Sequence, residues 1–79
     1  MSTFTAYRAR SEFATDRAHW EPVGTDGEVF TSFESAANAC DGDARRRGAA
    51  VPANWLPLPK DVHRSRPQDG VLYLVDRNA

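Results

Sequence analysis

The sequence of residues 31–48 is TSFESAANACDGDARRRG, and it contains the clearest periodic pattern in the chain. Its apolar residues recur with the spacing i, i+3, i+4, i+7 and i+11, which is typical of one face of an α-helix. The residues on this face are Phe33, Ala36, Ala37, Cys40 and Ala44. Thr31 and Glu34 fit a capping box at the start of the helix, and Gly48 is a natural end. We therefore predict a helix whose small side chains allow close packing against a sheet.

A β-hairpin is expected directly before this helix. Its two arms, Ala18–Val23 and Glu28–Phe33, flank the turn sequence GTDG at residues 24–27. Asp-Gly favours a turn because Gly, and to a lesser extent Asp, accepts a positive φ. Pro22 has no backbone N–H, so the first arm is predicted to be an edge strand or to be bulged there.

Strands are also predicted near both ends of the chain. Ser2–Ala9 is rich in β-branched and aromatic residues, and Gly70–Asp76 is apolar on both faces, as expected for a central strand. Between them, four prolines in Ala49–Asp69 break any long element, and at most one helical turn is expected at residues 59–66. The predicted fold is α+β, a single domain of residues 1–79 in which a three- to four-stranded, mainly antiparallel sheet carries one helix on a face.

The composition argues against several classes of protein. The chain has 79 residues, with 10 Lys and Arg against 11 Asp and Glu and a net charge of −1. We therefore expect no direct nucleic-acid binding, because no basic field covers the molecule. The longest apolar run, Val71–Val75, is far shorter than the ~20 residues of a membrane span. Residues 1–6 lack the charged and apolar regions of a signal peptide, so a cytoplasmic location is expected.

Few side chains are suited to catalysis or metal binding. The soft and imidazole ligands are His19, Cys40 and His63, and their spacing matches no metal motif. Cys40 lies on the apolar helix face, where a free cysteine usually packs as a small hydrophobic residue. A single cysteine forms no internal disulfide, which favours a reducing compartment. We expect no enzymatic activity, no metal and no cofactor.

The basic side chains are candidates for binding a protein partner. They gather at the end of the helix and in the proline-rich segment, at Arg45, Arg46, Arg47, Lys60, Arg64 and Arg66. If that segment folds back beside the helix end, these residues form one patch near Trp55, and Arg and Trp are enriched at binding hot spots. The alternative interpretation is complementation of the helix dipole together with ordinary loop solubility.

Two further features have open interpretations. The acidic residues Glu34, Asp41 and Asp43 are expected on the solvated surface of the helix, or form an acidic patch toward a basic partner. The sequence WLPLP at residues 55–59 is either a lid on the core or a loop that docks on a partner. An exposed hairpin edge is able to pair with a second copy, so the protein is expected to be a monomer or a homodimer.

Two resemblances bear on function. Residues 27–36, GEVFTSFESA, resemble the junction of hairpin and helix in small DNA-binding domains of the phage integrase arm type, which implies a nucleic-acid-binding accessory or regulatory protein. Glu21, Asp26 and Glu28 put acid where those domains carry a basic face.

The whole chain resembles small phage-encoded inhibitors, in particular anti-CRISPR proteins that act on type I systems. The resemblance lies in its length, its α+β pattern and the lack of a catalytic set of residues. It implies stoichiometric binding to a subunit of a host CRISPR surveillance complex, with DNA recognition or nuclease recruitment blocked as the result.

Overall fold

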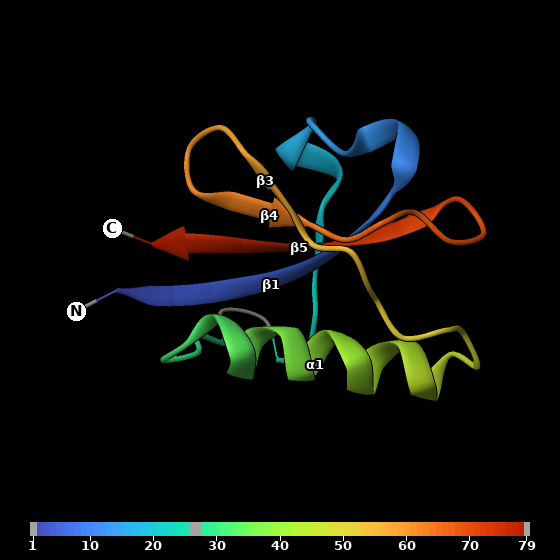
Figure 1. Ribbon diagram of the computed structural model, residues 1–79, viewed down its shortest axis with the longest axis horizontal. Coiled ribbons are helices and arrows are strands. Elements are labelled where there is room, and N and C mark those ends of the chain that lie inside the picture. Colours follow the sequence, from blue (N-terminus) through green and yellow to red (C-terminus); the bar gives the residue numbers. More distant parts are fainter. Residues whose placement is uncertain (1, 26–27, 79) are drawn as a thin grey trace.

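An antiparallel sheet of five strands carries one α-helix on a single face (Figure 1). The structure is a computed structural model that describes residues 2–25 and 28–78. The sheet order is β2-β1-β5-β4-β3. The strands are β1 (Thr3–Arg10), β2 (Glu21–Pro22), β3 (Leu56–Leu58), β4 (Val62–Arg64) and β5 (Val71–Asn78). The helix α1 is Phe33–Arg46, and two 3-10 turns, η1 (Ser11–Phe13) and η2 (Arg17–His19), follow β1. The α+β prediction is confirmed, with five strands rather than three or four.

The two long central strands, β1 and β5, pair along their whole length. The register runs from Thr3 opposite Asn78 to Arg10 opposite Val71. Leu72 and Leu74 are completely buried. This burial agrees with the prediction of a central last strand, because a strand that is apolar on both faces must be covered on both.

The two faces of the sheet carry separate apolar clusters. On the helix face, α1 packs on β1 and β5 through a buried cluster of Ala6, Val23, Ala36, Cys40, Ala44, Tyr73 and Val75. The opposite face holds Ala9, Val62, Leu72 and Leu74, with Tyr7 and Trp20 packed against them. The segment with η1 and η2 lies on this second face, across the sheet from α1 (Figure 1).

The expected hairpin before the helix is wrong, because both of its arms pair with β1 instead of with each other. Glu21 and Pro22 lie opposite Arg8 and Tyr7, and further along β1 the backbone groups of Phe30 and Phe4 exchange two hydrogen bonds of 2.8 Å. This arrangement gives partners to backbone groups on the outer edge of β1, which a hairpin standing alone would leave open. Pro22 does lie in an edge strand, as predicted. Half of the expected turn, residues 26 and 27, lies outside the described residues.

The helix begins one residue later than a capping box at Thr31 requires. Ser32 is the N-cap, and its hydroxyl oxygen accepts a hydrogen bond of 3.1 Å from the backbone N–H of Ser35. Thr31 and Ser32 both carry the hydroxyl that a cap needs, so the sequence alone does not separate them. Gly48 follows the C-cap with a φ of +70°, which confirms it as the end of the helix.

The proline-rich segment forms a small hairpin rather than a helical turn. β3 and β4 pair with Leu58 opposite Val62, and Lys60 and Asp61 in the turn both have positive φ. Pro57 lies in the edge strand β3, where a missing N–H is tolerated. Within the described part of the chain, no helix has the length and apolar character needed to cross a membrane.

Candidate partner-binding site

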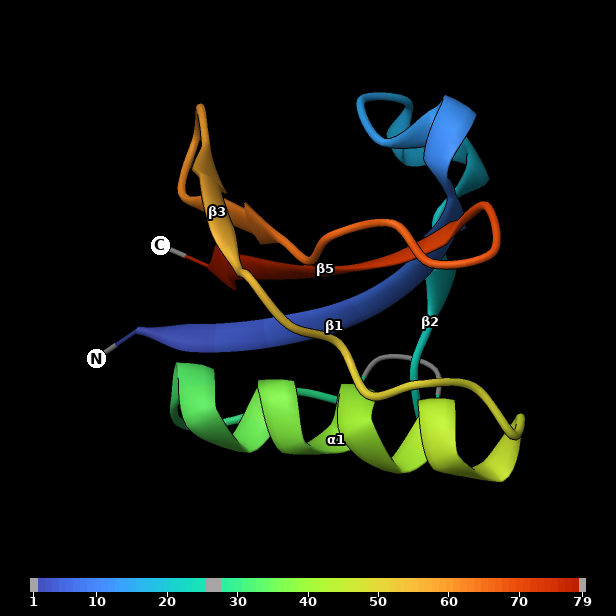
Figure 2. The ribbon, with the colours of Figure 1, turned by 45° about the vertical axis from the view of Figure 1, so that its right-hand side comes forward.

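An open cleft lies at the end of the molecule where α1 begins. Both termini of the described chain are on this same side (Figures 1 and 2). The cleft has a volume of about 470 Å³ and is lined by Ser2, Phe4, Phe33, Trp55, His63 and Arg77. This volume falls in the range of small-molecule and side-chain pockets. We call it the aromatic cleft.

The rings of the aromatic cleft pack edge to face around Phe33. The ring centroids of Phe33 and Trp55 are 5.5 Å apart with an interplanar angle of 83°, and those of Phe33 and His63 are 5.1 Å apart at 64°. Such tilted pairs are the favoured aromatic geometry and hold each ring in place. All three side chains stay half-buried, so they keep apolar surface in contact with solvent.

Arg77 is the cation at the rim of the aromatic cleft. Its Nε donates a hydrogen bond of 2.9 Å to the hydroxyl of Ser2, and its backbone N–H donates to the carbonyl of Asp61 at 3.1 Å. Among the described residues, no carboxylate lies within 4.0 Å of its guanidinium. The side chain is therefore anchored while its charge remains available to a ligand.

The predicted basic residues do not gather into one patch. Arg47 and Arg66 do line the same small depression, beside Tyr73 at the far end of α1. Trp55 instead packs on Phe33 at the start of α1, about 20 Å away along a 14-residue helix. Lys60 lies in the turn between β3 and β4, beside Asp61 and therefore at the cleft end of the sheet.

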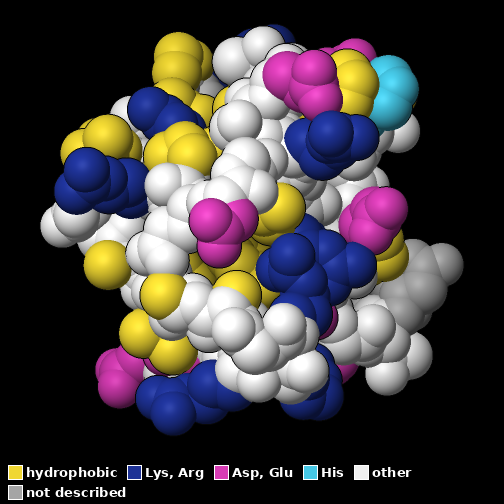
Figure 3. Space-filling model, turned by 90° about the vertical axis from the view of Figure 1, so that its right-hand side faces the viewer, with side chains coloured by type: hydrophobic (Ala, Val, Ile, Leu, Met, Phe, Trp, Pro, Cys, Tyr) yellow, Lys and Arg dark blue, Asp and Glu magenta, His cyan; other side chains and the backbone are white. Residues whose placement is uncertain are grey.

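The basic end of α1 nevertheless remains charged at its surface. Arg45, Arg46 and Arg47 are exposed in or just after the last turn, and Arg66 is also exposed. Arg64 is half-buried on β4. Of the six predicted basic residues, only Arg46 has an ion pair within the described chain, a long one of 3.9 Å to Asp43. Figure 3 shows lysine and arginine side chains spread over this end of the molecule, next to patches of hydrophobic atoms.

The acidic residues of the helix differ in their surroundings. Glu34 is exposed in the first turn and Asp41 is half-buried, but Asp43 is buried, so its expected place on the solvated surface is wrong. Because an α-helix turns about 100° per residue, Asp43 lies only about 20° from Ala36 around the axis, at one edge of the buried face.

Asp43 is the centre of a hydrogen-bonded ionic network. Its carboxylate accepts hydrogen bonds from the Tyr73 hydroxyl at 2.7 Å and from Arg8 Nη1 at 2.8 and 3.0 Å. Arg8 Nη2 in turn donates to Glu21 at 2.8 Å, and Arg47 Nη1 donates to the Tyr73 hydroxyl at 3.0 Å. The network therefore connects α1 with β1, β2 and β5.

The electrostatics of this network hold Asp43 ionised. Burial acts to raise the pKa of Asp43, but hydrogen bonds from Tyr73 and Arg8 and the charges of Arg8 and Arg47 outweigh it, so the pKa is lowered. Burial and the hydrogen bond to Asp43 raise the pKa of Tyr73. The hydrogen bond to Asp43 is the main cause that raises the pKa of Arg8. The three groups hold their charge states at neutral pH, as structural ion pairs do.

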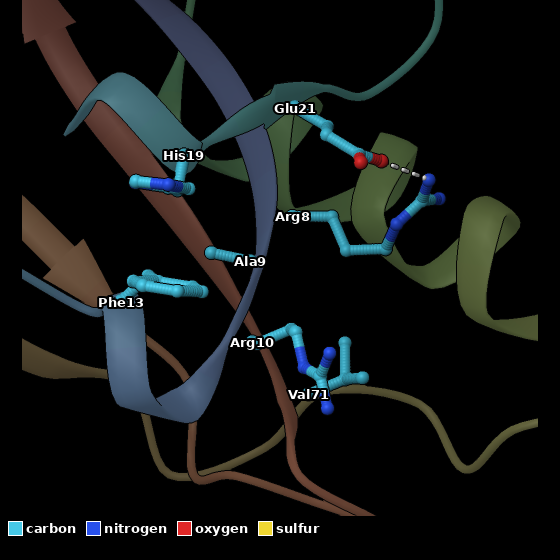
Figure 4. A pocket seen from close by; sticks show the side chains of 7 residues that line it. All are labelled: Arg8, Ala9, Arg10, Phe13, His19, Glu21 and Val71. Atoms are coloured by element: carbon cyan, nitrogen blue, oxygen red, sulfur yellow. Dashed lines mark hydrogen bonds and ion pairs between the residues drawn. The ribbon is translucent and has the colours of Figure 1, made fainter. Parts of the chain in front are cut away.

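A second depression lies where β1 extends past β2. It has a volume of about 210 Å³ and is lined by Arg8, Ala9, Arg10, Phe13, His19, Glu21 and Val71. Phe13 and His19 stack with centroids 4.1 Å apart, and Arg8 turns away from them toward Glu21 (Figure 4). Arg10 pairs with Glu12 at 3.1 Å. The arginines of this depression are thus already paired within the chain.

Cys40 and the histidines are placed apart. Cys40 is completely buried under α1, and burial, with smaller contributions from Asp41 and Asp43, raises the pKa of its thiol to about 12. His19 hydrogen-bonds to Asp16 at 2.8 Å on the surface, whereas His63 lines the aromatic cleft. No group of three or more His, Cys, Asp or Glu side chains suited to a metal ion occurs within residues 2–25 and 28–78.

Comparison with protein-family models, curated proteins and solved structures gives no match. Sequence reasoning found Trp55 but missed its neighbours Phe4, His63 and Arg77 as site residues, and assigned Phe33 to the core alone. No local pattern marks these residues, because they come from four different elements and meet only through the pairing of β1, β5 and β4.

Proposed function

We propose that this protein acts without catalysis, as an inhibitor that binds one partner protein stoichiometrically through the aromatic cleft. The observation that carries the proposal is the set of half-buried rings of Phe4, Phe33 and Trp55 around one open cavity. A domain of this size has little apolar surface to spare for anything but its core. Aromatic side chains that remain open to solvent in a concave site are typical anchors of protein interfaces.

The charged end of α1 supports the same proposal in a second way. Arg45, Arg47 and Arg66 have no ion-pair partner among the described residues. They lie at the opposite end of α1 from the cleft, but exposed charges outside the contact still steer the encounter, and so accelerate association with a partner of opposite sign more than they increase affinity. Replacement of Arg45–Arg47 by Glu is therefore expected to slow association.

The resemblance to type I anti-CRISPR proteins indicates which partner to test first. We propose a subunit of a CRISPR surveillance complex in the host cytoplasm. A single buried thiol, Cys40, agrees with a reducing compartment of this kind.

The test compares two tryptophan variants for binding to a purified type I surveillance complex. Trp55→Ala removes a ring of the aromatic cleft, and Trp20→Ala removes a matched half-buried ring on the opposite face of the sheet. Trp55→Ala removes a hot-spot aromatic and is expected to weaken binding by about tenfold or more, whereas Trp20→Ala is expected to leave the affinity unchanged. Both variants are first checked by circular dichroism to be folded at the assay temperature. Equal weakening by both variants, or no binding of the unaltered protein at micromolar concentration, would contradict the proposal.

Arg45 and Arg47, which make no ion pair with any described residue, favour nucleic-acid binding as the second candidate function. Binding of this kind depends steeply on salt, because each neutralised phosphate releases counterions. A gel-shift titration at several salt concentrations separates the two candidates. An affinity that falls as salt is added, and that Arg45→Gln and Arg47→Gln each weaken, would favour nucleic-acid binding. An affinity that does not change with salt would exclude it.

A further inference from the structure

The aromatic cleft combines an apolar interior with one anchored cation. Its lining contains the rings of Phe4, Phe33 and Trp55, and Arg77 is its single arginine or lysine. A ligand that fills this cleft must bring an apolar group to the rings. An anion close to that group would gain a partner at the rim.

The geometry of Arg77 favours a carboxylate as that anion. Its Nε is used by the hydroxyl of Ser2, and its two terminal nitrogens make no hydrogen bond to the described residues. Two parallel N–H groups match the two oxygens of a carboxylate, and an anchored guanidinium loses less side-chain entropy on binding than a free one.

The groups around Arg77 leave its charge uncompensated. Asp61 offers only its backbone carbonyl, which accepts from the Arg77 N–H at 3.1 Å, and the adjacent Lys60 adds a second positive charge. His63 across the cleft packs its ring against Phe33. In the part of the chain that the structure describes, no acidic side chain therefore competes for the Arg77 guanidinium.

We infer that the aromatic cleft binds an acidic peptide segment of the partner, with an apolar side chain seated among the rings of Phe33 and Trp55 and a neighbouring carboxylate paired to Arg77. This inference rests on the proposed function and specifies the chemistry of the ligand. A peptide fits better than a nucleic acid, because a strand that stacks a base also needs cations along its backbone. Of the other arginines that make no ion pair with a described residue, Arg45, Arg47 and Arg66 lie at the far end of α1, and Arg64 is half-buried on β4.

The experiment uses capped tetrapeptides as probes and the two tryptophans as reporters. One set has the sequence Gly-Asp-X-Gly and the matched set Gly-Asn-X-Gly, where X is Phe, Trp or Leu. The chain has two tryptophans, and the indole N–H of Trp20 donates to the Phe13 carbonyl at 2.9 Å on the opposite face of the sheet. Nuclear magnetic resonance of the nitrogen-15-labelled protein thus follows Trp55 in the cleft and Trp20 as an internal reference.

The expected result is a saturable shift of the Trp55 indole signal, with the Trp20 signal unchanged. The Asp peptides should bind about threefold or more tightly than the Asn peptides, as an exposed charge pair allows. Arg77→Gln should remove this difference, because the exposed side chain carries the pairing charge. Arg10→Gln, which removes an exposed charge at the other end of β1, should preserve it.

Each alternative outcome has a definite meaning. Equal binding of Asp and Asn peptides would overturn the carboxylate inference and leave the apolar binding of the proposed function standing. No shift of Trp55 with any peptide would overturn the inference, and if Trp55→Ala also leaves capture of the surveillance complex unchanged, the proposed function fails as well. A shift caused by oligothymidylate but by no peptide would identify a base-stacking site and contradict both.

Discussion

The hydroxyl of Tyr73 on β5 donates a hydrogen bond of 2.7 Å to the carboxylate of Asp43 on α1. The same carboxylate accepts from Arg8 on β1, so one buried acid connects the helix to both central strands. All buried side-chain nitrogen and oxygen atoms of the described residues have a hydrogen-bond partner. Removal of one member of such a network leaves its partner as a buried polar group without a hydrogen bond.

Removal of the Tyr73 hydroxyl is therefore expected to destabilise the fold. Tyr73→Phe should lower the free energy of unfolding by about 1–3 kcal/mol, because Asp43 keeps its burial but loses a donor. Tyr7→Phe is the matched control, since the hydroxyl of this half-buried tyrosine makes no hydrogen bond within residues 2–25 and 28–78. Urea denaturation of both variants measures the difference. A loss for Tyr73→Phe no larger than that for Tyr7→Phe would show that the hydrogen bond does not stabilise the protein.

The lowered pKa of Asp43 predicts a dependence of stability on acid. Its pKa in the folded protein is below the ordinary aspartate value of 3.8, so folding favours the ionised form. The resulting stability is fully present above the pKa of the unfolded chain and is lost as the pH falls through the pKa of the folded protein. Asp43→Asn removes this titration. The difference in unfolding free energy between the unaltered protein and Asp43→Asn should be constant from neutral pH down to about pH 5 and shrink below about pH 4. A difference that stays constant down to pH 2 would contradict the assignment.

The features that the sequence predicted correctly depend on local periodicity. The helical spacing of Phe33, Ala36, Cys40 and Ala44 and the apolar run of β5 each fix an element without reference to the rest of the chain. Asp43 was misplaced for a different reason. Its position on the helix places it on the buried face, whereas its charge predicts exposure to solvent. Hydrogen bonds from Arg8 and Tyr73, which are distant in sequence, compensate the cost of burying this charge.

Long-range pairing explains the remaining differences. The two arms of the expected hairpin satisfy the local turn pattern, yet β1 gives both of them a partner, and a local pattern contains no information about that competition. The aromatic cleft could not be predicted from local sequence patterns for the same reason. Phe33 lies on the predicted apolar face of the helix, but it lines a cleft only because β4 and the segment before β3 bring His63 and Trp55 to its ring.

The choice of Ser32 over Thr31 as N-cap can be tested by substitution. Ser32→Ala should cost about 1 kcal/mol, because it removes the acceptor of the Ser35 N–H. Thr31→Ala, at an exposed residue directly before the cap, should change the free energy of unfolding by less than half as much. Thermal unfolding followed by circular dichroism compares the two. If Thr31→Ala instead had the larger effect, Thr31 would be the N-cap.

Two glycines of the helix region are expected to respond in opposite directions to alanine. At Gly42 a Cβ would meet only the end of the flexible Arg46 side chain, at 3.4 Å, so Gly42→Ala should stabilise the protein by about 0.5–1 kcal/mol. At Gly48 a φ of +70° disfavours any side chain although space is open, so Gly48→Ala should destabilise it by about 1 kcal/mol. Chemical denaturation of the two variants gives both signs. Stabilisation by Gly48→Ala would mean that the helix does not end in a left-handed residue.

The thiol of Cys40 reports how often the helix separates from the sheet. Burial raises its pKa to about 12, so in the folded protein it is protonated and shielded at pH 8, whereas an unfolded thiol has a pKa of about 8.5. Labelling by a disulfide reagent should therefore require opening of the structure. If so, Tyr73→Phe should accelerate labelling by about tenfold for each 1.4 kcal/mol of stability that it removes, while Tyr7→Phe leaves the rate unchanged. Labelling is followed by absorbance at pH 8, with protein unfolded in urea as the reference for full reactivity. A fast rate that is the same in all three proteins would place Cys40 at the surface and contradict the packing of α1 on β1 and β5.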